Sequence, residues 1–600
     1  MLRFLSIINT WLEKQPFLFA IGVNVLLFVL TYTLFVPRFN TVDDVGMLLR
    51  VAGVSRVNEA TQYILHSNIL IGYLMKYLYG LSADVVWYTW HHIIVLFVAY
   101  TTLLYTFIRN LSNVVMLGLY VAFFFLVGIF ILLNLQFTIV ASIVSFAGIM
   151  LVLFDRNEYK LSKKEADNDE VVLELNTLSL ERLKKTLFQF NYKSLFSIVS
   201  LSGIVIMVYG SMVRWMTVQQ TIALFIPVIA FLLYKKNYFD VYRKILLLFI
   251  GLFISFGLSQ YDKRVCYKNE GYKYWHQFRQ TYKRIFDYKE IDTLTPKDKE
   301  TLLAEANWSH NDYLMLQGWG YSDQNLFNID RGEKASKFLE NADRIYYSFS
   351  EIKTFMFELL SSRIVMNTLL FIGLIWLFLA FEWRYLLQLM AVVSIVLLLL
   401  LYLLYYMKPP TDRTLFQMLF FICVTTLALI NNSSYKKAIN SPKNNTIFLV
   451  FLLLPITFVT QQEYASLSKS NFYKNVWLKK SIEDLNPNKN ELYITWGQAI
   501  PLEYLSPFSN LDMFDNLVIF HKGVDQITPA ALNILKDKGI KNVYKAIANN
   551  KNVSLILRNN ASNKINLYIT YMKEHYNQKL NYPKVVYKNN VYTVYKFNSK

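Results

Sequence analysis

The chain has 600 residues, of which 54% are hydrophobic and 17% are charged, and its formal net charge is +19. Soluble domains carry roughly 25% charged residues, whereas no Asp, Glu, Lys or Arg occurs in the 44 residues from Leu111 to Phe154. This composition excludes a soluble enzyme, a secreted disulfide scaffold and a disordered chain. It predicts a polytopic α-helical membrane protein.

Weakly charged windows recur along the chain, and a bilayer core takes about 20 apolar residues per helix. Backbone groups must form their own hydrogen bonds in lipid, so each window is expected to be a helix. The eleven expected spans are 17–36, 87–108, 112–133, 137–154, 195–213, 219–234, 245–260, 364–381, 385–407, 414–432 and 446–462.

The positions of Lys and Arg beside short connections predict that the N-terminus lies inside. With this orientation every short inner loop holds a basic residue, and segments 37–86, 261–363 and 463–600 lie outside. Segment 62–80 is apolar but contains a His and a Lys, and counting it as a span would invert every later loop. It is expected to lie in the outer interface as an amphipathic helix; a re-entrant segment is the other possibility.

The chain is expected to divide into a membrane domain, residues 1–462, and an outer C-terminal domain, residues 463–600. The second part alternates short β-type runs with helical patterns, which predicts a small α/β domain. The expected strands are 491–495, 517–520, 553–557, 584–587 and 591–597, and one helix is expected over 529–538. The two cysteines, Cys266 and Cys423, predict neither a disulfide nor a zinc site.

Two adjacent carboxylates, Asp43 and Asp44, follow the first span by about seven residues. Adjacent carboxylates raise one another's pKa when they are partly removed from water, and this suits a general base. The alternative is an ordinary acidic loop or a cap for the following helix.

Three basic residues depart from the inner bias and lie at the outer ends of spans: Arg214, Lys408 and Arg413. Positive charge at the outer headgroup level is what a lipid-linked phosphate requires, because Arg offers a bidentate fork and Lys a point charge. The alternative for each is simple contact with headgroups.

His91 and His92 open the second span near the outer surface. Histidine within a span points to function, and Asp43 or Asp44 could be the partner; a structural role is the alternative. In the outer loop 261–363, Trp308, Asn311 and Asp312 combine an aromatic ring with amide and carboxylate groups. This combination is typical of sugar binding, although an aromatic cluster that stabilises the fold explains it too.

The layout resembles the GT-C class of integral-membrane glycosyltransferases. The likeness rests on the acidic pair in loop one, on a second long outer loop after span seven, and on several short phrases. These phrases are His66 to Gly72, Leu135 to Thr138, Gly210 to Arg214 and Trp308 to Asp312, and they are similar to phrases in uncharacterised bacterial members. The second acid is Asp44, where the best-known members carry Glu.

The resemblance implies a multi-pass protein of the bacterial cytoplasmic membrane that uses a polyprenyl-phosphate sugar at the outer face. Asp43, with Asp44, would be catalytic, Arg214, Lys408 and Arg413 would hold the donor phosphate, and the acceptor would be an envelope glycan, teichoic acid or lipid. Transfer would invert the anomeric centre. Apart from this donor no cofactor is expected, a divalent metal is left open, and no nucleic acid partner is expected.

Two other functions fit parts of the pattern. One is a polymerase or ligase that transfers a glycan from a lipid diphosphate, although an acidic pair directly after the first helix is not typical of such enzymes. The other is a transporter or flippase without chemistry, which predicts duplicated halves and charges near the middle of the membrane. The sequence contains neither feature.

Overall fold

The structure is a computed structural model of the full chain. It describes residues 2–57, 59–155, 197–234, 238–286, 290–341, 349–378, 383–406, 411–430, 455–523 and 525–597.

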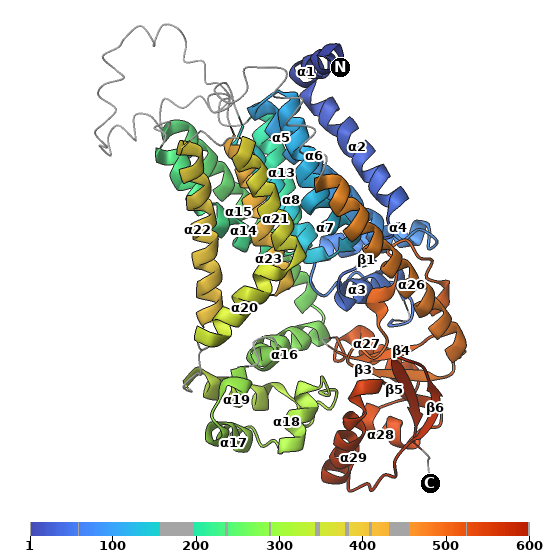
Figure 1. The fold of residues 1–600 in the computed structure, drawn as a ribbon. Coiled ribbons are helices and arrows are strands. Elements are labelled where there is room, and N and C mark those ends of the chain that lie inside the picture. Colours follow the sequence, from blue (N-terminus) through green and yellow to red (C-terminus); the bar gives the residue numbers. More distant parts are fainter. Residues whose placement is uncertain are drawn as a thin grey trace.

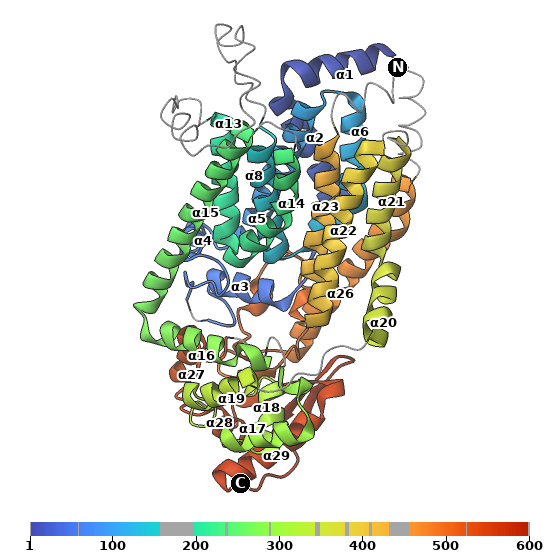
Figure 2. The ribbon, with the colours of Figure 1, turned by 90° about the vertical axis from the view of Figure 1, so that its left-hand side faces the viewer.

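A body of long apolar helices forms the upper part of the molecule in Figures 1 and 2. Among the described residues, six helices are long and apolar enough to cross a membrane, or seven if a pair bent by 67° is one span. The protein therefore has the architecture of a helical membrane protein. The helices of this body are α1 (Leu2–Lys14), α2 (Pro16–Leu34), α5 (Trp87–Asn110), α6 (Val114–Phe123), α7 (Ile129–Leu133), α8 (Phe137–Leu153), α13 (Ile198–Val213), α14 (Trp215–Tyr234), α15 (Tyr238–Tyr267), α20 (Phe349–Ser361), α21 (Arg363–Phe378), α22 (Trp383–Tyr406) and α23 (Asp412–Leu429).

Several boundaries differ from those expected. Helix α15 runs well beyond the expected span 245–260, so Cys266 lies in its last turn rather than in a loop. The chain is helical from residue 455 through α26 (Ala465–Leu485), so the expected division at residue 463 falls inside a continuous helix. Residues 446–454 of the last expected span lie outside the described residues.

Helix α8 is the centre of the body, since all 17 of its residues are buried. It packs closely on α13 through small residues, which let two backbones approach each other in a membrane protein. A Cβ atom on Gly148 would lie 2.5 Å from the Gly203 carbonyl oxygen, and one on Gly203 would lie 2.8 Å from the Gly148 carbonyl oxygen. Nearer the end of α13, where Arg214 follows, a Cβ atom on Gly210 would lie 2.9 Å from the Ala141 carbonyl oxygen, so this end of α13 packs on the first half of α8.

The lower part of the molecule holds a five-stranded sheet. Its strands are β3 (Leu492–Trp496), β4 (Ile519–Lys522), β5 (Val553–Arg558), β6 (Lys584–Lys588) and β7 (Tyr592–Lys596), in the order β4-β3-β5-β7-β6. Strands β3, β4 and β5 are parallel, and the other two pairings are antiparallel. The strands begin and end within about two residues of their expected positions.

Further helices accompany this sheet in the lower part (Figure 1). Helices α27 (Pro529–Asp537), α28 (Val543–Asn549) and α29 (Asn563–Tyr576) come from the same C-terminal segment. Helices α16 (Glu270–Phe286), α17 (Pro296–Glu305), α18 (His310–Gln317) and α19 (Ile329–Asn341) come from the outer loop. The loop helices and the sheet share one core, in which Phe278, Tyr321 and Phe520 are fully buried. The two segments therefore form one layer.

Helix α3 (Val42–Ala52) lies between this layer and the upper helices (Figures 1 and 2). It is preceded by β1 (Arg38–Phe39), which pairs in parallel with β2 (Asn134–Leu135) just before α8. Helix α4 (Ile69–Leu81) follows, capped by the Asn68 side chain. The expected interfacial helix 62–80 is therefore helical only from residue 69, and whether it lies in the interface or re-enters stays a prediction.

Gly148→Ala should force α8 and α13 apart, because the new methyl group would overlap the Gly203 carbonyl oxygen. Overpacking of this kind costs about 1–3 kcal/mol, so we expect a lower melting temperature of the purified protein. Gly22→Ala is the matched control, since nothing lies within 4 Å of a Cβ atom at that position. Equal melting temperatures of the two variants would contradict the packing described.

Candidate active site

Asp44 is a structural carboxylate at the start of α3. Its side chain is fully buried and accepts hydrogen bonds from Thr41 Oγ1 at 2.7 Å, from Tyr88 at 3.2 Å and from the Phe137 N–H at 2.9 Å. Phe137 is the first residue of α8, so Asp44 caps that helix and ties it to α3 and α5. Burial raises the pKa of Asp44 to about 7, against the opposing effect of these hydrogen bonds.

Asp43 points elsewhere, because adjacent residues on a helix do not share a face. It lines a cavity of about 390 Å³, called here the Asp43 cavity, which is formed by α3, the outer loop and the C-terminal sheet. The Asp43 side chain is exposed to this cavity, but protein surrounds it on most sides. Burial therefore raises the pKa of Asp43 above its ordinary value of 3.8, and Asp525 adds to the increase.

Three arginines from distant segments lie close enough to Asp43 to oppose that increase. In order of effect they are Arg413 at the start of α23, Arg214 between α13 and α14, and Arg279 in α16. Two of them, Arg214 and Arg413, were predicted from the sequence. Lys408, the third predicted cation, lies outside the described residues.

A stack of side chains holds Arg214 beside the start of α8. Its Nη1 donates to Thr138 Oγ1 at 2.7 Å, and its guanidinium carbon lies 4.9 Å from the centre of the Phe137 ring. His66 also stacks on Phe137, with ring centres 5.5 Å apart. Burial and the nearby arginines lower the pKa of His66 well below its ordinary value, so this ring is neutral near pH 7.

The lower wall of the cavity is formed at the carboxyl ends of β3, β4 and β5. Gly497 and Gln498 follow β3, His521 and Lys522 end β4, and Arg558 ends β5. In open sheets with parallel strands, ligands bind outside these ends, where neighbouring connections run in opposite directions. This condition is met at β3. The chain passes from β3 to β4 on one side of it, and β5 pairs with β3 on the other side.

Trp319 from the outer loop closes another side of the cavity. Its φ of +65° is unusual for a bulky residue, and the surrounding loop is held in place by hydrogen bonds to the sheet region. Trp496 Nε1 donates to the Gly318 carbonyl at 2.5 Å, and Gln526 Nε2 donates to the Trp319 carbonyl at 2.9 Å. Strained residues held by their surroundings concentrate at functional sites.

His91 and His92 are buried but do not line the Asp43 cavity. His91 Nε2 lies 2.7 Å from the Tyr209 hydroxyl, and His92 Nδ1 lies 2.7 Å from the Tyr88 carbonyl oxygen. The expected direct partnership with Asp43 or Asp44 is therefore wrong. The link between this pair and Asp44 runs through Tyr88, whose hydroxyl donates to Asp44.

The structure places Trp308, Asn311 and Asp312 away from the Asp43 cavity. The Trp308 ring is buried in the core of the lower layer, and Asp312 forms a capping box with Ser309 at the start of α18. Asn311 Nδ2 donates to the Leu567 carbonyl at 3.2 Å, which joins α18 to α29. These contacts stabilise the packing of the outer loop on the C-terminal segment, and a role in sugar binding stays a prediction.

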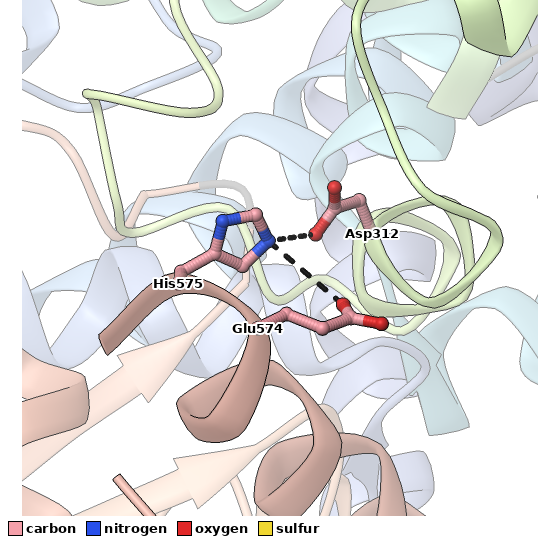
Figure 3. A group of neighbouring side chains, drawn as sticks. All are labelled: Asp312, Glu574 and His575. Carbon is pink, nitrogen blue, oxygen red and sulfur yellow. Dashed lines mark hydrogen bonds and ion pairs between the residues drawn. The ribbon is translucent and has the colours of Figure 1, made fainter. Parts of the chain in front are cut away.

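Asp312 also belongs to a group with Glu574 and His575 whose ligand atoms lie within 4.8 Å of one another (Figure 3). His575 Nε2 lies 2.7 Å from Asp312 Oδ1 and 4.0 Å from Glu574 Oε2. Such atoms fit a divalent cation, but Ser309 already donates to both carboxylates. The group is explained as a polar contact between α18 and α29.

The sequence predictions missed Arg50, Arg56, His66, Lys522 and Lys564, all of which line the cavity. One signal was available for Lys522, because it lies two residues after the expected strand 517–520. No local pattern marks Arg50 and Arg56, whose position depends on how α3 packs against the sheet.

Comparison with known proteins found no matching family model, no matching curated protein and no matching solved structure.

Asp44→Asn should lower the stability of the protein without acting directly on the cavity. An amide in this position must turn its NH₂ group toward one of three donors, and an unsatisfied buried group costs about 1–3 kcal/mol. Melting temperatures of Asp44→Asn and Asp43→Asn should therefore differ, with only the first clearly reduced. A greater loss of stability in Asp43→Asn would contradict the division of roles between the two acids.

Proposed function

We propose that this chain is a membrane glycosyltransferase that moves a sugar from a polyprenyl-phosphate donor to an acceptor of the cell envelope. One observation carries the proposal. Asp43 faces a cavity, and Arg214, Arg279 and Arg413, from three distant segments, lie close enough to lower its pKa.

Three of the phrases on which the GT-C resemblance rests, together with the acidic pair, meet at this point. Asp44 of loop one accepts from Phe137, Arg214 donates to Thr138, and His66 stacks on Phe137. The Asn68 N–H, in the same phrase as His66, donates to the Met212 carbonyl at 2.8 Å. A shared location for segments so far apart in the sequence supports a shared function.

In the proposed reaction the acceptor hydroxyl attacks the anomeric carbon of the donor, and the bond from that carbon to the phosphate oxygen breaks. The proton of the hydroxyl passes to the Asp43 carboxylate, and polyprenyl phosphate leaves. Arg214 and Arg413 stabilise the negative charge that develops on the leaving phosphate. One displacement of this kind inverts the anomeric centre.

The proposed topology has eleven spans, with the N-terminus inside and the sheet outside a bacterial cytoplasmic membrane. Its support is the arrangement in Figure 1, where the two termini lie at opposite ends of the molecule. The Asp43 cavity is lined by α3, the segment that follows it, Trp319 and the ends of the sheet strands, and in the proposed topology this region faces the outer headgroups.

Asp43→Asn should reduce sugar transfer by about 10²- to 10⁴-fold, the usual contribution of a general base. Lipid-donor binding should change little, because the amide keeps the size of the side chain. The measurement is transfer of radiolabelled sugar from defined polyprenyl-phosphate sugars by the purified full chain. Asp330→Asn, an exposed carboxylate in α19, is the matched control. Activity of Asp43→Asn equal to that of this control would remove the proposed base.

Arg413→Gln should move the acid limb of the pH–rate profile. Burial raises the pKa of Asp43, so the ionised base is lost as the pH falls through a value above 3.8. Arg413 opposes this increase, and its removal should raise that pKa further and move the limb to higher pH. Profiles of kcat/KM for the two proteins measure the effect. An unchanged or lower limb in Arg413→Gln would contradict an electrostatic contact with the base.

A further inference from the structure

The sheet side of the Asp43 cavity holds positive charge that the transfer step does not use. Arg56, Lys522 and Lys564 line this side, and among the described residues none of the three forms an ion pair. The other two basic residues there are paired, Arg50 with Asp525 at 2.6 Å and Arg558 with Glu503 at 3.5 Å. The cavity lining also holds the carboxylates of Asp43 and Asp525 but more basic than acidic side chains, and an excess of one charge sign concentrates ions of the opposite sign.

Lys522 is the most informative of these residues. Its side chain is 0% exposed, and its Nζ has no hydrogen-bond partner among the described residues. The ammonium group lies between two rings, 4.1 Å from the centre of Trp496 and 3.9 Å from the centre of Tyr544. An unpaired buried ammonium is costly for folding, and Lys522 belongs to the cavity lining, so an anion in the cavity would stabilise the protonated form.

Arg56 reaches the cavity from the segment that follows α3, where the Ser55 carbonyl accepts a hydrogen bond from the Ile519 N–H of β4 at 3.0 Å. It is 5% exposed, and its Nε has no hydrogen-bond partner among the described residues. The approach depends on Gly46, because a Cβ atom there would lie 2.8 Å from Arg56 Nη1. Burial lowers the pKa of the Arg56 guanidinium, and Asp525 and, to a smaller degree, Asp43 oppose that decrease. The unpaired cations are thus near the proposed base.

Lys564 adds a third cation from the start of α29 and lies 5.5 Å from the centre of the Trp496 ring. Burial, with a smaller effect of Arg558, lowers the pKa of Lys564 to about 8. Burial and the nearby Lys564 also lower the pKa of Lys522. An anion between the amines of Lys522 and Lys564 would raise both pKa values again, because opposite charge favours the protonated forms.

We infer that the sheet side of the Asp43 cavity binds a phosphate group, and that this phosphate belongs to the acceptor. Arg56 supplies a planar fork and the two lysines supply point charges, the combination that proteins use for phosphate. The identification with the acceptor rests on the proposed function, whereas phosphate binding does not. The donor phosphate would lie at Arg214 and Arg413, and the acceptor phosphate at Arg56, Lys522 and Lys564. Asp43 lies between these two groups.

The test measures how fast Lys564 is acylated in the detergent-solubilised full chain at pH 8, by mass spectrometry of its peptide. Inorganic phosphate and glycerol 3-phosphate should each slow this acylation several-fold, while chloride at equal ionic strength should not. Lys545, elsewhere in the same segment, is the internal reference. A second arm places the protein in nanodiscs with or without phosphatidylglycerol. Protection by glycerol 3-phosphate in both types of nanodisc supports a soluble phosphate group, whereas protection by the lipid alone assigns the site to a headgroup and overturns the acceptor assignment.

Lys522→Met provides the decisive variant, because methionine has a similar length and no charge. It should need about tenfold more phosphate for the same protection, and its melting temperature in phosphate-free buffer should equal or exceed that of the wild type. Arg56→Gln should also lose protection. Wild-type acylation that phosphate does not slow, or variants protected like the wild type, would overturn the inference. Asp43→Asn should keep the protection, so loss of transfer and loss of phosphate binding can be told apart.

Discussion

The hydrogen bonds of Asp44 are the constraint on which the site depends. This buried carboxylate accepts from Thr41, Tyr88 and the Phe137 N–H, and so joins the starts of α3 and α8 to α5. With α3 fixed in this way, Asp43 on the neighbouring helical face is directed into the cavity. The same start of α8 holds Arg214 through Thr138 and His66 through Phe137. The start of one helix therefore positions both the proposed base and one of the cations proposed to act with it.

Two groups of basic residues lie near Asp43, and they differ in the structural elements that carry them. Arg214 follows the last residue of α13 and Arg413 lies at the start of α23, and in the proposed function both hold the donor phosphate. Arg56, Lys522 and Lys564 lie against the carboxyl ends of parallel strands, where a water-soluble group can enter. A transferase that joins a lipid-linked sugar to an extracytoplasmic acceptor needs access from both sides. In the proposed function, the arginines at the helix ends serve the lipid side and the cations at the sheet serve the acceptor side.

Much of the fold could be predicted, because hydropathy and periodicity are local properties of the sequence. The strands at 492–496 and 553–558 lie nearly where alternation placed them, and the apolar helices match most expected spans. The position of Asp43 near Arg214 and Arg413 was also expected, from the outer ends of three different segments. The different roles of Asp43 and Asp44 could not be predicted from the sequence, because the rotation of α3 about its axis decides which of the two side chains is buried.

The rest of the site depends on tertiary packing that no local pattern records. Arg56 reaches the cavity only because Gly46 leaves room for it, and Lys522 is buried between rings from β3 and α28. Trp308 and Asp312 have the composition of a sugar site but are used for core packing and helix capping. The central claim is that a lipid phosphate binds beside Asp43, and an experimental structure of the full chain with polyprenyl phosphate tests it most directly. The account predicts phosphate density in contact with Arg214 and Arg413 and facing Asp43. Density on another surface of the protein, with these arginines unchanged, would contradict it.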